Sequence, residues 1–199
     1  NRPVVNRKVV EQLDRFHPDV VHTSLVLGFG GGVWRAARRY PLVHTIRDYY
    51  LVCARAAPRR GGVNCTNQCA TCRIATAPMR RATRHLDLAT GVSKDIVDRH
   101  RRWRSVARGL RLEVVYNRPP ALTMPEQVVR NDDRRIVGYL GRLAPEKGIG
   151  VWIEAIALIE DRNVQLVGAG RGSGEEEAQI RRAAVRYPRI AFMVLQYPR

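Results

Sequence analysis

Residues 136–148 place an apolar run, a glycine-bounded loop and an amphipathic stretch in direct succession, and this order restricts the fold more than any other feature. Residues 136–140 predict a buried strand. The loop that follows carries Arg142 and Lys147. Apolar residues then recur at helical spacing from Ile149 onward. A strand, a basic glycine loop and a helix in this order indicate a βα unit, and the N-terminus of its helix attracts anions such as phosphate.

The next segment repeats this order. Residues 164–167 predict a short strand, and Gly168 and Gly170 predict a turn where the backbone can approach a ligand. Ser173 with Glu176 predicts a capping box at the start of another helix. Because ligands of parallel α/β sheets bind at the carboxyl ends of the strands, the two glycine loops should meet at one edge. We expect a phosphate or diphosphate site there; the alternative is an ordinary crossover with charged surface residues.

Helix and strand patterns also alternate through the first part of the chain, which predicts the α/β class with parallel strands. Residues 118–133 are polar, aperiodic and contain prolines, so they predict a linker. We therefore expect two incomplete Rossmann-like units, residues 1–117 and residues 134–199.

These motifs resemble the retaining glycosyltransferases of family 4, which have the two-domain GT-B fold. The donor domain of that family carries a G-R-L-x-x-E-K-G-like loop and, further on, a V-G-x-G loop. The matching positions in this sequence are Gly141, Arg142, Leu143, Glu146, Lys147 and Gly148, and then Val167, Gly168 and Gly170. The resemblance implies that Arg142 and Lys147 hold the diphosphate of a nucleotide sugar. It also implies that Glu146, Gly168 and Gly170 belong to the same donor site.

The first part of the chain resembles the acceptor domain of the same family, at residues 18–22, 44–53, 91–93 and 114–117. The resemblance implies glycosyl transfer from a nucleotide-diphosphate sugar to a saccharide or lipid-linked acceptor, as in polysaccharide biosynthesis, without a catalytic metal. Two features of the family are not found in this sequence: the first strand with its glycine loop, and the later E-x7-E motif. We therefore expect GT-B units truncated at both ends that are inactive alone, within a longer protein that is active.

Four cysteines lie within the loop of residues 49–75: Cys53, Cys65, Cys69 and Cys72. The sequence begins without a recognisable export signal, which favours a reducing compartment, where clustered thiols bind metal more often than they form disulfides. Four thiolates can complete a tetrahedral structural zinc site. An iron–sulfur cluster, and unligated thiols or a disulfide, are the alternatives.

Arg47 and Asp48 follow the strand predicted at residues 42–46, close to His44. Because the carboxyl end of a strand faces the ligand in such sheets, we expect Arg47 and Asp48 to be catalytic-site residues. Arginine stays protonated and cannot act as a base, but it can hold a phosphate or carboxylate bidentately. The alternative is an ion pair of little consequence.

The formal net charge is +17, and only 3 of the 35 basic residues are lysine. One explanation is a basic, zinc-containing module that binds nucleic acid, which is the alternative function. Anionic lipid headgroups would also attract these charges, and arginine-rich codon usage is a third explanation. The sequence contains no run of about 18 apolar residues that could cross a membrane. We expect a cytoplasmic protein, with peripheral attachment to the inner face of the membrane as an option.

Overall fold

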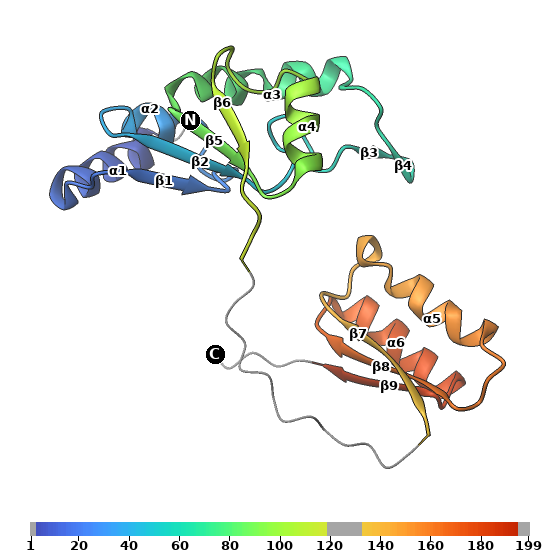
Figure 1. Cartoon of the computed structure of the whole chain (residues 1–199). Helices are drawn as coiled ribbons and strands as arrows, with labels where there is room; N and C mark the ends of the chain where they lie inside the picture. The colour runs from blue at the N-terminus through green and yellow to red at the C-terminus, as the bar shows by residue number, and fades with distance from the viewer. Residues whose placement is uncertain (1–2, 119–132, 195–199) are drawn as a thin grey trace. The chain divides into compact units, whose positions relative to one another are not determined.

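The computed structural model describes residues 3–118 and 133–194. The chain divides into two compact units, Asn1–Leu122 and Thr123–Arg199. Of the linker predicted at residues 118–133, residues 119–132 lie outside the described residues. Each unit is described by itself below, and Figure 1 labels the elements of both.

Unit 1 is built on a four-stranded parallel sheet in the order β1-β2-β5-β6. The strands are β1 (Val21–Ser24), β2 (Leu42–Ile46), β5 (Leu88–Gly91) and β6 (Arg111–Val114). The helices are α1 (Pro3–Phe16), α2 (Gly32–Ala37), α3 (Ala70–Ala82), the 3-10 turn η1 (Thr83–His85) and α4 (Lys94–Arg102). A short antiparallel hairpin, β3 (Arg59–Arg60) and β4 (Val63–Asn64), lies in the cysteine loop.

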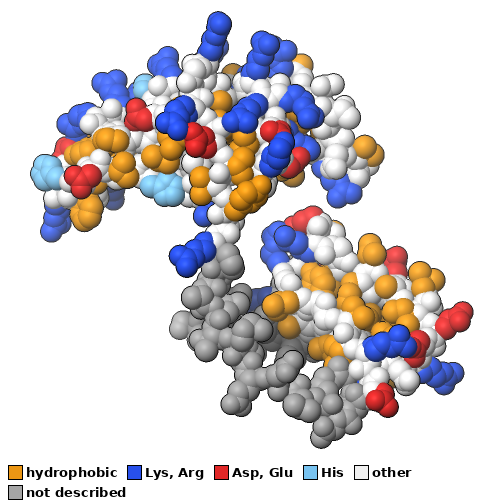
Figure 2. Space-filling view, in the orientation of Figure 1, with side chains coloured by type: hydrophobic (Ala, Val, Ile, Leu, Met, Phe, Trp, Pro, Cys, Tyr) orange, Lys and Arg blue, Asp and Glu red, His pale blue; other side chains and the backbone are white. Residues whose placement is uncertain are grey.

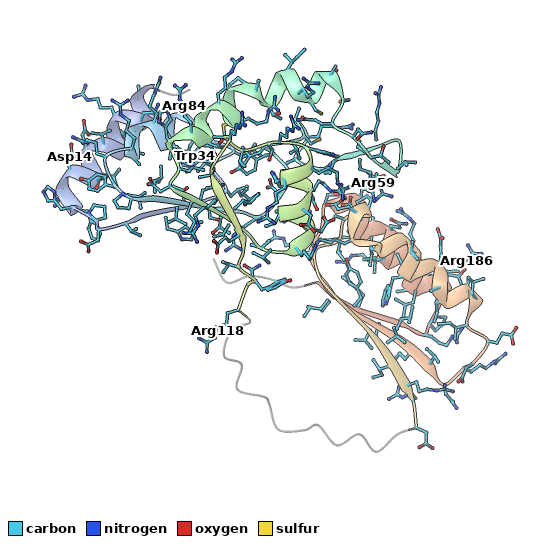
Figure 3. All side chains as sticks on the ribbon, turned by 45° about the horizontal axis from the view of Figure 1, so that its top comes forward. Asp14, Trp34, Arg59, Arg84, Arg118 and Arg186 are labelled. Carbon is cyan, nitrogen blue, oxygen red and sulfur yellow. The ribbon has the colours of Figure 1, made fainter. Side chains whose placement is uncertain are left out.

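The hydrophobic core of unit 1 contains side chains from both its helices and its sheet. Trp34 from α2, Val97 from α4 and Ala89 from β5 are fully buried in one hydrophobic cluster. Figure 3 places Trp34 inside this unit. Strand β2 is buried along almost its whole length because a strand lies on each side of it. This arrangement confirms the predicted α/β class with parallel strands.

Unit 2 contains a three-stranded parallel sheet in the order β7-β8-β9. Its strands are β7 (Arg135–Leu140), β8 (Val164–Gly170) and β9 (Ile190–Val194), and its helices are η2 (Pro145–Lys147), α5 (Ile149–Leu158) and α6 (Gly174–Arg186). Ile153 and Ile156 of α5 share a core with Ile180 of α6 and Leu166 of β8. The two α-helices therefore pack against the same sheet.

Two local predictions were wrong, and one helix was not predicted. Strand β7 is mostly exposed rather than buried, with Leu140 81% exposed, because it is the edge of the three-stranded sheet formed by the described residues. Gly168 and Gly170 are not a turn, since both lie in β8. Helix α3 was not predicted, because residues 49–75 were expected to be a loop with little periodicity, whereas the helix begins at Ala70.

No helix among the described residues is both long enough and apolar enough to cross a membrane.

Candidate functional site

A pocket of about 870 Å³ lies at the carboxyl ends of β7 and β8 in unit 2. It is lined by three groups of residues: the end of β7 with the loop that follows it, the end of β8 with its loop, and the start of α6. These residues are Leu140–Glu146, Gly170–Ser173 and Glu176. The loops that follow β7 and β8 therefore meet at one edge of the sheet, where a parallel sheet binds its ligands.

The floor of the pocket depends on a close approach of two backbone segments. A Cβ atom at Gly170 would lie 1.9 Å from the carbonyl oxygen of Gly141, so only glycine fits there. Just beyond, the Leu143 N–H donates to the Arg171 carbonyl at 2.8 Å. These contacts extend the β7–β8 pairing into the loops and fix both loops at the rim of the pocket.

Arg142 lines the pocket and is held by its own loop. Its Nη2 lies 2.5 Å from Oε1 of Glu146, and its carbonyl oxygen accepts a hydrogen bond from the Tyr139 hydroxyl at 2.8 Å. Lys147 is exposed at the end of η2 and is not among the residues that line the pocket. The next residue, Gly148, has a positive φ of 75°, and this left-handed turn directs the chain into α5.

Arg171 is a pocket residue that the sequence reasoning missed. It follows Gly170 directly, so its position after the second glycine loop was the available signal. Gly168, in contrast, does not line the pocket. A Cβ atom at Gly168 would lie 2.5 Å from the Phe192 ring, so this glycine allows the ring to pack against β8.

The predicted capping box at the start of α6 is confirmed. The Ser173 N–H donates to Glu176 Oε2 at 3.0 Å, and the Ser173 hydroxyl contacts the same carboxylate. These hydrogen bonds from Ser173 lower the pKa of Glu176 below its usual value. Glu176 lines the same pocket as Arg142 and Arg171.

In unit 1, Arg47 and Asp48 follow β2 at the carboxyl edge of the sheet. Arg47 Nε donates to the Ser24 hydroxyl at 2.8 Å, which joins the ends of β2 and β1. The Asp48 carboxylate accepts the Tyr50 N–H at 2.9 Å. Within the described residues no ion pair joins Arg47 to Asp48, so the two side chains have separate partners.

Two buried histidines lie behind this edge. His44 Nδ1 is 2.8 Å from the Thr23 hydroxyl, and its Nε2 is 2.5 Å from the Tyr50 hydroxyl. His100 contacts Ser105 Oγ and the Asp48 carbonyl. Burial lowers the pKa of His44 and that of His100 to about 4, so both rings are neutral at pH 7.

The cysteine loop does not form the expected zinc site. Among the described residues, no group of three or more His, Cys, Asp or Glu side chains is arranged to hold a metal ion. Cys53 is buried and its thiol donates to the Ala57 carbonyl at 3.2 Å, whereas Cys69 is exposed at the start of α3. The four cysteines therefore have different environments, and neither a structural zinc ion nor an iron–sulfur cluster is supported.

Comparison with protein families decides the assignment. Residues 1–118 match the sequence model described as Glycosyltransferase Family 4. The chain belongs to glycosyltransferase family 4. Residues 122–188 match a second model of the same kind, Glycosyl transferases group 1. The resemblance predicted from the glycine loops is confirmed.

Curated proteins match parts of the chain. An uncharacterized 42.6 kDa protein in the cps region of Klebsiella pneumoniae is 25% identical over 155 residues, which is 77% of this chain and 40% of that protein. The glycogen synthase of Hydrogenovibrio crunogenus is 37% identical over 75 residues, covering 37% of this chain and 15% of the synthase. The chain thus spans less than half the length of these curated relatives.

A solved structure gives the same fold. The crystal structure of Anabaena Alr3699/HepE in complex with UDP matches 96% of this chain and 51% of that protein, with a TM-score of 0.63 and 18% sequence identity. The predicted α/β fold class of GT-B type is therefore confirmed for this member of the family.

Proposed function

We propose that the protein containing this chain transfers a sugar from a nucleotide-diphosphate sugar to a saccharide or lipid-linked acceptor, with retention at the anomeric carbon. The observation that carries the proposal is the pocket at the ends of β7 and β8, where Arg142 and Arg171 meet the backbone of Gly170. Membership of family 4 supports it, as do a glycogen synthase among the relatives and a structural neighbour in complex with UDP.

In this proposal the diphosphate binds beside Arg142. Negative charge grows on the diphosphate as the bond to the sugar breaks, and fixed positive groups stabilise that charge without a metal ion. Glu146 holds the Arg142 guanidinium 2.5 Å away and so limits its motion. Lys147, at the exposed end of η2, supplies a second positive charge from the same loop. Gly170 allows the backbone of Gly141 to approach at the floor of the pocket, and Gly168 allows the Phe192 ring to pack against β8.

Arg47 and Asp48 are proposed to act on the acceptor. The Arg47 guanidinium is exposed and uses its Nε for Ser24, so its terminal nitrogens can hold a phosphate or carboxylate of the acceptor. Asp48 keeps a carboxylate oxygen beyond the one that accepts the Tyr50 N–H. That oxygen can accept a hydrogen bond from an acceptor hydroxyl.

Calorimetric titration of this chain with UDP tests the donor half of the proposal. We expect saturable binding of UDP. The variants Arg142→Ala and Lys147→Ala should each weaken it about tenfold or more, because each loses one charge-assisted contact. Arg162→Ala is the matched control, because Arg162 is exposed and precedes β8 at the opposite edge of the sheet. Equal UDP affinity in all three variants would refute the donor site.

The alternative, a nucleic-acid-binding module, makes a different prediction about salt. Affinity for nucleic acid falls steeply as salt rises, because many phosphate contacts release counterions. A pocket with two or three cationic side chains depends much less on ionic strength. Titrations with UDP and with a duplex oligonucleotide at two salt concentrations therefore distinguish the two functions.

A lipid-linked acceptor would place unit 1 at an anionic membrane surface. Arg35, Arg81 and Arg84 line one hollow beside α2 and α3, and Figure 2 displays many Lys and Arg side chains over this unit. Figure 3 labels Arg84 at the surface. Burial and then Arg84, Arg38 and Arg35 lower the pKa of His85, as a local positive field would. Cosedimentation with phosphatidylglycerol vesicles, but not with phosphatidylcholine vesicles, is the expected result.

A further inference from the structure

Three of the four cysteines gather where the cysteine loop enters α3. Cys72 lies in the first turn of α3, and its Sγ is 3.9 Å from Sγ of Cys53. Cys69 is the N-cap residue of the same helix, three residues before Cys72. Residues three apart at a helix start lie on the same face, so Cys69 and Cys72 are neighbours.

The three thiols differ in access. Cys53 is 3% exposed, Cys72 is half-buried, and Cys69 is exposed. A reagent from solvent therefore reaches Cys69 most readily and the buried Cys53 least.

Hydrogen bonds of the Gln68 side chain stabilise this arrangement of the cysteines. Gln68 Nε2 donates to the Val52 carbonyl at 2.8 Å and contacts the Thr76 hydroxyl at 3.2 Å. Val52 precedes Cys53, and the Thr76 hydroxyl also donates to the Cys72 carbonyl at 2.8 Å. Gln68 and buried Thr76 therefore connect the backbone next to Cys53 with the backbone of Cys72.

We propose that Cys53, Cys69 and Cys72 form a thiol–disulfide exchange site that reacts with small disulfides of the glutathione class and ends as a Cys53–Cys72 disulfide. A disulfide needs its sulfurs about 2.05 Å apart, so forming it requires the two sulfurs to move closer than their 3.9 Å contact. This is a modification site in unit 1, separate from the donor pocket of unit 2.

The reaction proceeds by three exchanges, each an attack of a thiolate on a disulfide sulfur. The Cys69 thiolate attacks the small disulfide, forms a mixed disulfide and releases one small thiol. The Cys72 thiolate then attacks the Cys69 sulfur and releases the second small thiol. Finally, the Cys53 thiolate attacks the Cys72 sulfur, and Cys69 leaves and regains a proton. Overall, two protein thiols are oxidised and one small disulfide is reduced to two thiols.

The disulfide would join two segments on either side of the hairpin β3–β4. Cys53 comes a few residues after Arg47 and Asp48, which follow β2, and Cys72 lies in α3. Closing this loop restricts the unfolded chain and therefore stabilises unit 1. The oxidised form should thus resist denaturant better than the reduced form.

The test uses the full chain, reduced and then incubated with oxidised glutathione. Non-reducing proteolysis with mass spectrometry should find a Cys53–Cys72 cross-linked peptide as the main product, with loss of two hydrogen atoms per chain and reversal by dithiothreitol. Cys69→Ser should slow its formation by roughly tenfold, because the accessible entry thiol is gone. In Cys72→Ser, the reaction should stop at the mixed disulfide between Cys69 and glutathione.

Cys65→Ser is the matched control, since Cys65 lies in the same loop and should leave the product and its rate unchanged. Circular dichroism of each serine variant establishes that the fold is retained, and Gln68→Ala supplies a second variant that keeps every thiol and should slow the last exchange. A main product that links Cys65, or a rate unaffected by Cys69→Ser, would overturn the proposal. So would purified chain that carries one zinc ion and whose thiols react only after a chelator removes the ion.

Discussion

A Cβ atom at Gly170 would lie 1.9 Å from the carbonyl oxygen of Gly141, so the two glycine loops of unit 2 approach each other backbone to backbone. This contact brings the ends of β7 and β8 close enough for Leu143 to continue the pairing with Arg171 and Gly172. The shape of the proposed donor pocket follows from it.

Gly170→Ala should therefore damage both stability and ligand binding. We expect a loss of about 1–3 kcal/mol in the free energy of unfolding, the usual cost of forcing extra volume into a close contact, together with loss of UDP binding. Gly138→Ala is the matched control on the neighbouring strand, since no atom lies within 4 Å of its added Cβ. Denaturant titration and calorimetry measure the two effects; equal behaviour of both variants would contradict the role given to Gly170.

Arg142→Ala in the complete protein should lower kcat/KM for the nucleotide sugar by about 2–4 kcal/mol of transition-state stabilisation. The reason is that charge on the diphosphate increases as the bond breaks, so the loss should fall mainly on kcat. Steady-state kinetics with Arg162→Ala as control provide the measurement. If Arg142→Ala raised KM alone, the guanidinium would be a ground-state binding group instead.

Arg47→Lys should impair use of the acceptor more than use of the donor. Lysine keeps the charge but cannot hold an anion bidentately while also donating to Ser24, as Arg47 does through Nε. We expect the KM for the acceptor to rise several-fold, while the KM for the nucleotide sugar stays constant. Ser24→Ala, which removes the partner but keeps the arginine, should have a smaller effect of the same kind. An unchanged acceptor KM in Arg47→Lys would exclude a role in acceptor binding.

The stability of unit 1 should fall as the pH drops from about 6.5 towards 4. His44 and His100 have folded pKa values of about 4, below the ordinary 6.5, so the unfolded state binds protons first. The contribution of the two neutral rings to the free energy of unfolding is complete above pH 6.5. It is lost as the pH falls through the folded pKa, and the loss is about 3 kcal/mol for each ring. Denaturant titrations at pH 7 and pH 5 measure the slope. His44→Gln should reduce the slope, and a variant with the full wild-type slope would contradict the assignment.

Local sequence patterns were sufficient for much of unit 2. The apolar runs predicted β7 and β8, the spacing from Ile149 predicted α5, and Ser173 with Glu176 predicted the start of α6. Each of these depends on residues within a few positions of one another. The meeting of the two glycine loops also followed, because parallel βα units present their carboxyl ends at one edge.

Predictions failed where the deciding contact lies far along the chain. Gly168 was expected to lie in a turn, but it lies in β8 against Phe192, 24 positions later. Helix α3 begins at Ala70, within the segment expected to be a loop, and Gln68, just before its N-cap residue, donates to the Val52 carbonyl. The cysteine spacing permitted a zinc site, but spacing does not define the direction of a thiol.

The sequence by itself determined the α/β class, the family motifs at 141–148 and 167–170, and the presence of Arg142, Glu146 and Lys147 on one loop, because these are properties of local order along the chain. Only the tertiary structure decided that Arg171 joins the pocket, that Arg47 pairs with Ser24, and that Cys53 meets Cys72. These residues are 19 to 29 positions apart along the chain, as Cys53 and Cys72 or the pocket residues Arg142 and Arg171 are, and only packing of the sheets and helices brings such residues together.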